Sequence, residues 1–168
     1  VAEDHDSNPL KIGLGKLKNN PDTKVLAINP VRTGYNAIAD EWVGIRPGTD
    51  GLFIGALIHE LLRAEKVDWG YLCRYTNSPW LVIDDKGAAD HGLFARDKAG
   101  DPLCYDLTSK SILSALDIDV TPALVGSYTL EDGRTAVPSF QHFATRFMSD
   151  AYSPETASVE TGIEADTI

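Results

Sequence analysis

Two short polar segments near the start of the chain carry groups that could hold a phosphate-bearing ligand. Asn29-Pro30-Val31-Arg32-Thr33 follows one apolar run, and Arg46-Pro47-Gly48-Thr49-Asp50 follows another. Backbone N–H groups in such turns, and the positive end of a helix that follows one, suit a phosphate. Arg32 could stack on the ligand or pair with it, and Asp50 could accept hydrogen bonds from a guanine ring. The sequence therefore indicates a nucleotide-type site.

The elements expected to position these segments are two strands and a helix. Residues 24–28 (KVLAI) are predicted to form a buried strand of a parallel sheet, and residues 42–45 (WVGI) the next strand. The strongest helix pattern follows at 50–64, and its apolar residues on most sides predict a well-buried helix. Ligands of open α/β sheets bind beyond the carboxyl ends of the strands, so the two turns would line one crevice if the strands are neighbours. Pro-Gly-Thr-Asp before a helix is equally typical of an ordinary turn with an N-cap.

Helices are expected on both sides of these strands. A helix beginning at Pro9, where the missing N–H costs little, carries leucines at i, i+4 and i+7, and a later helix is predicted with Asp68 as its cap. Ser139 and Ser153 are candidate N-caps near the end of the chain. Pro154 would then occupy a first helical position, and Gly162 would end the last helix.

The segment 78–138 has a different character. Short apolar runs alternate there with Asp, Lys and Gly turns, and this pattern predicts β-hairpins, most strongly at Asp132-Gly133. The predicted fold is therefore a single α/β domain over 1–168. A Rossmann-like parallel sheet with flanking helices would occupy 1–77 and 139–168, and a hairpin-rich insertion would occupy 78–138.

Composition limits the classes of function. The 168 residues are 43% hydrophobic and 24% charged, as in globular proteins, and the net charge is −10. That balance argues against binding to nucleic acid or anionic membranes. No apolar run approaches the roughly 18 residues of a membrane span. No signal-peptide pattern is visible, which favours the cytoplasm over the periplasm without fixing the compartment.

Few residues are candidates for catalysis or metal binding. Cys73 and Cys104 lack the CxxC spacing of a zinc or iron–sulfur site and are expected to be reduced, mostly buried thiols. His59 is expected to be a satisfied histidine of the core or its boundary. His91 and His142 fit solvated side chains better than a substrate funnel. The three tryptophans are expected to be packing residues. The chain has neither GxGxxG nor GxxxxGK[ST], so NAD-type and P-loop sites have no local support.

The order of motifs over residues 25–77 is specific. A strand ends in Asn-Pro-Val-Arg-Thr, an Ala-Asp pair follows at 39–40, a second strand ends in Pro-Gly-Thr-Asp, and a long apolar helix leads to Asp68 and Tyr75-Thr76. This series resembles the molybdopterin-dinucleotide-binding region of molybdenum oxidoreductases of the dimethyl sulfoxide reductase type. That superfamily also contains formate dehydrogenases and nitrate reductases. The start (VAEDHDSNP) and the end (YSPETASVETGIEADTI) are also similar to segments of these proteins, so the resemblance covers 1–77 and 150–168.

The resemblance implies contacts to the guanosine diphosphate arm of one pterin cofactor. Asn29 stands where the family usually has Asp, Val31 where the first Arg often stands, and Glu3 where an amide falls. An acidic Glu3 beside a pyrophosphate is unfavourable unless it faces ribose hydroxyls. The residues carried over from the family as cofactor-binding are Ala2, Glu3, Asn29, Pro30, Val31, Arg32, Thr33, Gly48, Thr49 and Asp50.

The resemblance also implies a larger enzyme. Molybdopterin guanine dinucleotide would hold molybdenum or tungsten there, and the reaction would be a two-electron oxidation or reduction of a small-molecule redox substrate. The metal ligand and any iron–sulfur cluster would lie upstream of Val1, and a closing domain downstream of Ile168. The expected partners are the remaining domains of the same enzyme and an electron-transfer subunit.

No residue of this chain is nominated as catalytic or metal-ligating, and the chain alone is expected to be inactive. Two other interpretations stay open. One is a stand-alone domain that binds a free nucleotide or small metabolite. The other is a structural or interaction module that has lost the ligand.

Overall fold

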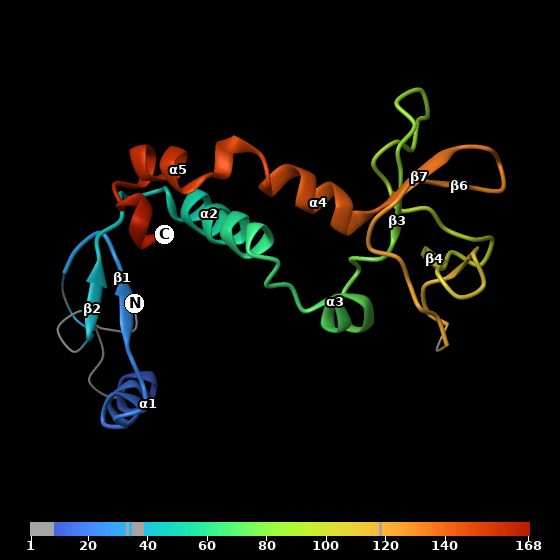
Figure 1. Ribbon diagram of the computed structural model, residues 1–168. Coiled ribbons are helices and arrows are strands. Elements are labelled where there is room, and N and C mark those ends of the chain that lie inside the picture. Colours follow the sequence, from blue (N-terminus) through green and yellow to red (C-terminus); the bar gives the residue numbers. More distant parts are fainter. Residues whose placement is uncertain (1–8, 33, 35–38, 118) are drawn as a thin grey trace. The chain divides into compact units, whose positions relative to one another are not determined.

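The computed structural model describes residues 9–32, 34, 39–117 and 119–168, which form two compact units (Figure 1). Unit 1 consists of residues 1–60 and 150–168, and unit 2 of residues 61–149. The elements are a mixture of helices, parallel strands and antiparallel strands, which confirms the α/β class. The units divide near residues 60 and 149, whereas the sequence placed its insertion at 78–138. The assignment of a single domain stays a prediction.

Unit 1 contains a small parallel sheet. Strands β1 and β2 lie side by side in the same direction, with Leu26 opposite Glu41 and Ile28 opposite Val43. The predicted parallel sheet is therefore confirmed, and its two strands are neighbours. The elements that begin in this unit are α1 (Pro9–Lys18), β1 (Leu26–Ile28), β2 (Glu41–Val43), α2 (Asp50–Arg63), the 3₁₀ turn η2 (Asp150–Tyr152), α5 (Pro154–Thr161) and the 3₁₀ turn η3 (Ala165–Thr167).

Two expectations of burial in unit 1 are wrong. Leu26 and Ile28 of β1 are 51% and 40% exposed, because the described residues do not cover the face of the sheet that carries both side chains. Helix α2 buries one face, formed by Phe53, Ala56 and His59, whereas Ile54 is 52% exposed. Strand β1 and helix α2 therefore carry apolar side chains that the described residues leave exposed.

The ends of helix α5 follow the sequence signals. The hydroxyl oxygen of Ser153 accepts a hydrogen bond from the Thr156 N–H at 3.2 Å, and Pro154 is the first helical residue. Gly162 adopts a left-handed conformation with φ of 75°, and its N–H donates to the Ser158 carbonyl. The residue after Gly162 then enters the core of unit 1, where Ile163 packs with Ile45 and Phe53.

Unit 2 is built from antiparallel strands and two helices. Its three-stranded sheet has the order β3-β7-β6, and β4 pairs with β5 as a separate hairpin. Its apolar core contains Leu81, Ile83, Ala95, Leu130 and Ala136. The elements are α3 (Trp69–Tyr75), β3 (Leu81–Ile83), β4 (Leu103–Asp106), β5 (Ser111–Ser114), β6 (Tyr128–Thr129), β7 (Thr135–Pro138) and α4 (Ser139–Phe147).

The local signals in unit 2 are confirmed with one exception. Gly133 has φ of 86° in the turn between β6 and β7, as the predicted hairpin requires. Asp68 caps α3 by accepting from the Tyr71 N–H at 2.8 Å. Ser139 is not the N-cap of α4, because Pro138 holds that position. The Ser139 hydroxyl instead donates to the Asn77 carbonyl at 2.7 Å.

One carboxylate of unit 2 is buried and fully used. Asp106 is 3% exposed and accepts hydrogen bonds from the N–H groups of Ser109 and Thr121 at 2.7 and 2.8 Å. These donors, with the Ser109 hydroxyl as the largest influence, lower the pKa of Asp106 to about 2. The charged Asp106 side chain therefore links the loop after β4 to the loop after β5.

In the part of the chain that the structure describes, no helix has the length and the apolar character of a membrane span.

Candidate cofactor-binding site

The two polar segments singled out in the sequence lie at the same end of the parallel sheet. Both strands point the same way (Figure 1), and Ile28 is opposite Val43, so Asn29 and Gly44 follow side by side. The Asn29 N–H donates to the Val43 carbonyl at 3.1 Å and extends the pairing by one residue. The condition set by the sequence, that the two strands are neighbours, is met.

The first segment forms a closed turn. The side-chain oxygen of Asn29 accepts from the Val31 N–H at 3.2 Å, which is an Asx turn. Val31 and Arg32 are exposed, and the Arg32 guanidinium lies over the indole ring of Trp42, 5.9 Å from its centroid. Asn29 in place of the family's Asp can therefore still form this turn. Thr33, and with it Ala2 and Glu3, lie outside the described residues.

The second segment ends at the first turn of α2. Gly48 has φ of 84°, and no atom lies within 4 Å of the position where a Cβ would stand. The Thr49 hydroxyl donates to the Arg46 carbonyl at 2.8 Å, and the Thr49 carbonyl accepts from the N–H groups of Leu52 and Phe53. Thr49 thus occupies the N-cap position, directly before the first helical residue Asp50.

Asp50 is the first residue of α2 and is exposed. Among the described residues its carboxylate has no hydrogen-bond partner, and the N–H groups of Asp50 and Gly51 have no acceptor. The start of an α-helix leaves such N–H groups free and carries partial positive charge. This turn therefore offers two donors for an anionic group and one carboxylate acceptor.

Arg46, the first residue of the second segment, is held by hydrogen bonds to the carboxyl end of α5. This role was not predicted from the sequence. The Arg46 N–H donates to the Thr161 carbonyl at 2.9 Å, and its guanidinium donates to the Val159 carbonyl at 2.7 Å. A longer contact of 3.4 Å reaches the Glu160 carbonyl. A cation at the carboxyl end of a helix is favourable. No local signal could have found this, because the two partners are more than 110 residues apart.

The Ala39-Asp40 pair of the family pattern has a structural role. The Asp40 carboxylate pairs with the Lys18 ammonium at the end of α1 and accepts from the Val25 N–H at 2.8 Å. The hydrogen bond from Lys18, followed by that from Val25, lowers the pKa of Asp40. Asp40 therefore links α1 to the start of β1, at the amino ends of the strands and opposite the end that carries the candidate site.

The groups gathered at this end of unit 1 suit binding rather than proton transfer. Among the described residues they include the N–H groups at the start of α2, the Arg32 guanidinium and the Asp50 carboxylate, which can bind a phosphate and a guanine base. The residues present therefore fit the nucleotide arm of a molybdopterin cofactor. Among the residues that the structure describes, no group of three or more His, Cys, Asp or Glu side chains converges as a metal site.

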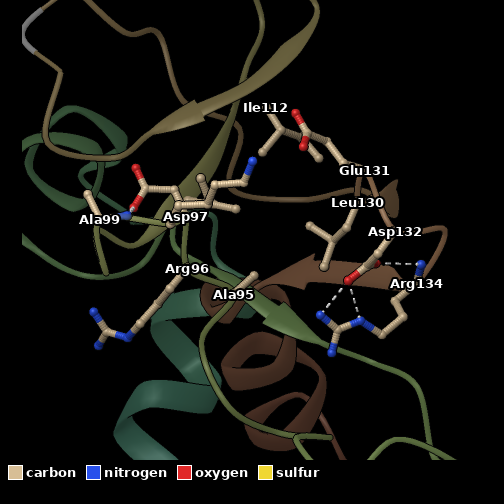
Figure 2. Close-up of a pocket in the computed structure, with 11 residues that line it drawn as sticks. Ala95, Arg96, Asp97, Ala99, Ile112, Leu130, Glu131, Asp132 and Arg134 are labelled. Carbon is tan, nitrogen blue, oxygen red and sulfur yellow. Dashed lines mark hydrogen bonds and ion pairs between the residues drawn. The ribbon is translucent and has the colours of Figure 1, made fainter.

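A separate pocket of about 670 Å³ lies in unit 2 (Figure 2). Leu103, Ile112 and Leu130 provide its apolar lining. The Arg134 guanidinium pairs with Asp132 and Asp90, and Arg96 extends away from Arg134 and donates to the Gly100 carbonyl. Both arginines are thus already bonded within the protein.

The cysteines line another pocket of unit 2, of about 850 Å³. Burial, followed by the charges of Asp106 and Asp117, raises the pKa of Cys104 to about 11, and burial also raises the pKa of Cys73. Cys73 is half-buried, Cys104 is buried, and neither forms a disulfide, as expected. Protonated thiols of this kind are poor nucleophiles.

The histidines do not assemble a catalytic group in the described residues. His59 is buried, as expected, and His142 is exposed. The His91 Nδ1 lies 3.9 Å from an Asp84 oxygen on the surface of unit 2. Among the described residues, none of the three belongs to a group of side chains that could hold a metal ion.

Comparison with known proteins finds relatives over all or part of the chain. A sulfite dehydrogenase subunit of Allochromatium vinosum is 45% identical over an alignment of 178 positions, which covers 100% of this chain and 18% of the relative. The nitrate-inducible formate dehydrogenase major subunit of Escherichia coli K12 is 36% identical over 48% of the chain and 8% of its own length. Dopamine dehydroxylase of Eggerthella lenta is 32% identical over 36% of the chain and 6% of its own length.

These relatives are much longer than the region compared. The chain spans less than a fifth of the length of each of the three. No protein-family model matches the chain. The match to the sulfite dehydrogenase includes the hairpin-rich segment 78–138, which the family motifs of unit 1 did not cover. On this identity, and on the formate dehydrogenases that share part of the sequence, the chain belongs to the molybdopterin oxidoreductase family.

Proposed function

We propose that unit 1 binds the guanine dinucleotide arm of a molybdopterin cofactor. The observation that carries the proposal is the parallel register of β1 and β2, which brings the segments 29–32 and 48–50 to one end of the sheet. In this proposal the N–H groups at the start of α2 and the Arg32 guanidinium bind phosphate oxygens. The Asp50 carboxylate accepts from the ring N–H and the amino group of guanine. Ala2, Glu3 and Thr33 stay predicted contacts.

The charges at this end of unit 1 support the proposal. A phosphate gains from the helix N-terminus and from an arginine that has no carboxylate partner among the described residues. A carboxylate without a partner, such as that of Asp50, gains when a ligand brings two aligned donors. The negative charge of Asp50 opposes a phosphate at the start of α2, and the hydrogen bonds that guanine donates to this carboxylate offset the repulsion.

We further propose that the longer protein is a molybdenum or tungsten oxidoreductase. The bound cofactor would supply the metal at which a two-electron oxidation or reduction takes place. Sulfite is the first substrate to test, because the relative matched over the whole chain belongs to a sulfite dehydrogenase. That relative is named as one subunit of its enzyme, which supports an electron-transfer partner for the longer protein. An iron–sulfur cluster, if present, would be bound outside this chain.

Calorimetric titration of the full chain with GDP, ADP and guanosine tests the nucleotide site. We expect GDP to bind more tightly than ADP. Asp50→Ala should weaken GDP binding by about 5- to 150-fold, the range for losing a bidentate contact to a base. Asp22→Ala is the matched control, because Asp22 is also exposed in unit 1 but precedes β1. Its GDP affinity should equal that of the wild-type chain.

Other outcomes of the titration favour the alternatives. Equal binding of GDP and ADP would indicate a general nucleotide-binding domain, and no binding of any nucleotide would indicate a structural module. For the longer protein, metal analysis and sulfite oxidation with an artificial electron acceptor form the second test. Absence of both molybdenum and tungsten from the purified active protein would contradict the proposed enzyme.

A further inference from the structure

Trp42 is the middle residue of β2 and lies near the carboxyl end of the parallel sheet, the end that carries the proposed site. The side chain of residue 42 and the position of residue 44 face the same side of β2, since side chains alternate along a strand. A Cβ built on Gly44 would lie 2.8 Å from the Cη2 atom of the Trp42 ring. The indole therefore covers Gly44, the residue beside Asn29 at the carboxyl end of the strands.

The indole contacts the first segment at two points. Its Nε1–H donates to the Asn29 carbonyl at 3.1 Å, and its ring face lies beneath the Arg32 guanidinium at 5.9 Å. The first contact fixes the backbone where the segment leaves β1. The second holds the exposed guanidinium, which would otherwise sample many rotamers.

We propose that Trp42 is a positioning residue for the nucleotide site and acts through Asn29 and Arg32. The inference rests on the proposed function of unit 1. Trp42 orders the first segment before the ligand arrives, and this lowers the entropic cost of binding. Gly44 is needed for this arrangement, because a side chain at position 44 would displace the indole from both contacts.

The size of the effect follows from the two contacts. Loss of one neutral hydrogen bond corresponds to about 2- to 12-fold in an equilibrium constant. Loss of an exposed cation–π contact corresponds to about 2- to 5-fold. Trp42→Phe keeps a ring beneath Arg32 and removes the N–H, so it should show the first factor. Trp42→Leu removes both and should show the product of the two factors.

The test is GDP affinity, measured by calorimetry on the full chain and its variants. Gly44→Ala leaves Trp42 intact but displaces its ring, so it should weaken GDP binding as much as Trp42→Leu does. The double variant Trp42→Leu/Gly44→Ala should bind GDP no more weakly than either single variant, because the two substitutions remove the same interactions. Gly15→Ala is the matched control, since a Cβ there meets nothing within 4 Å. It should bind GDP as the wild type does.

A fluorescence measurement separates positioning from packing. In a chain with Trp69→Phe and Trp80→Phe, all indole emission comes from Trp42. We expect this emission to change with GDP and to saturate at the calorimetric affinity, because Arg32 alters its contact with the ring when it binds phosphate. A residue that only packs would destabilise the chain when replaced, but its emission would not follow GDP.

The outcomes separate the two proposals. GDP binding that is equally tight in the wild type, Trp42→Leu and Gly44→Ala would overturn the role of Trp42 and leave the nucleotide site standing. Trp42 emission that stays unchanged at saturating GDP would also overturn the role of Trp42 and leave the nucleotide site standing. If the wild-type chain binds no GDP at any concentration, the proposed function fails, and the role of Trp42 fails with it.

Discussion

Replacement of Arg46 by alanine should lower the free energy of unfolding of unit 1 by a measurable amount. The change removes a 2.7 Å hydrogen bond to the Val159 carbonyl and a weaker 3.4 Å contact to the Glu160 carbonyl. It keeps the backbone bond from the Arg46 N–H to Thr161. The variant therefore isolates the contribution of the guanidinium to the link between the second segment and α5.

The magnitude can be worked out from these contacts. A hydrogen bond from a charged donor contributes about 1.5–3 kcal/mol, and a cation in the last turn of a helix about 0.3–1 kcal/mol. Arg46 is exposed, so the lower ends of both ranges apply. We expect Arg46→Ala to lower the free energy of unfolding of unit 1 by about 1–2 kcal/mol.

Amide hydrogen exchange followed by NMR is the suitable assay, because it reports the two units separately. Amides of α5 should exchange faster in Arg46→Ala, whereas those of β7 in unit 2 should be unchanged. Lys16→Ala is the control for loss of an exposed positive charge in unit 1. If the α5 amides of Arg46→Ala keep their wild-type exchange rates, the guanidinium does not stabilise this link and our reasoning is refuted.

Three further predictions concern unit 2. Leu81→Ala should cost about 2–5 kcal/mol in urea unfolding, because Leu81 is fully buried, whereas Leu93→Ala at a 62% exposed position should cost little. The lowered pKa of Asp106 stabilises the fold above the unfolded pKa near 4, and this stability should be lost as the pH falls from about 4 to about 2. Asp106→Asn should remove that part of the pH dependence in acid titrations followed by circular dichroism, and an unchanged acid transition would contradict it. Cys104, with a pKa of about 11, should react with a thiol reagent at pH 8 more slowly than in unfolded protein, and equal rates would refute its burial.

The features that the sequence predicted correctly are local ones. Asp68 caps α3, Ser153 caps α5, and Gly162 ends α5 because each acts on backbone groups within four residues. A parallel sheet was also predicted, from a helix followed by a short apolar run, whereas the pairing of β1 with β2 was only a condition of the predicted site. Such signals reflect backbone chemistry that hardly depends on the remainder of the fold.

The features that the sequence did not predict depend on distant partners. The Arg46 contact to the end of α5 crosses more than 110 residues, and the Trp42 contact to Asn29 depends on strand register. Burial of β1 was predicted wrongly, because an apolar run shows what a strand can bury and not which element covers it. Ser139 was a wrong cap because Pro138 takes the N-cap position and the hydroxyl has a better acceptor in Asn77.

The contact between Arg46 and Thr161 also bears on the order of folding during synthesis. Unit 2 is one continuous segment, residues 61–149, whereas unit 1 joins residues from both sides of it. A ribosome releases the whole of unit 2 before residue 161 emerges, so the hairpins of unit 2 can form while unit 1 still lacks α5. The long loop between Arg46 and Thr161 closes only after residue 161 has emerged, and this makes unit 1 the later unit to fold.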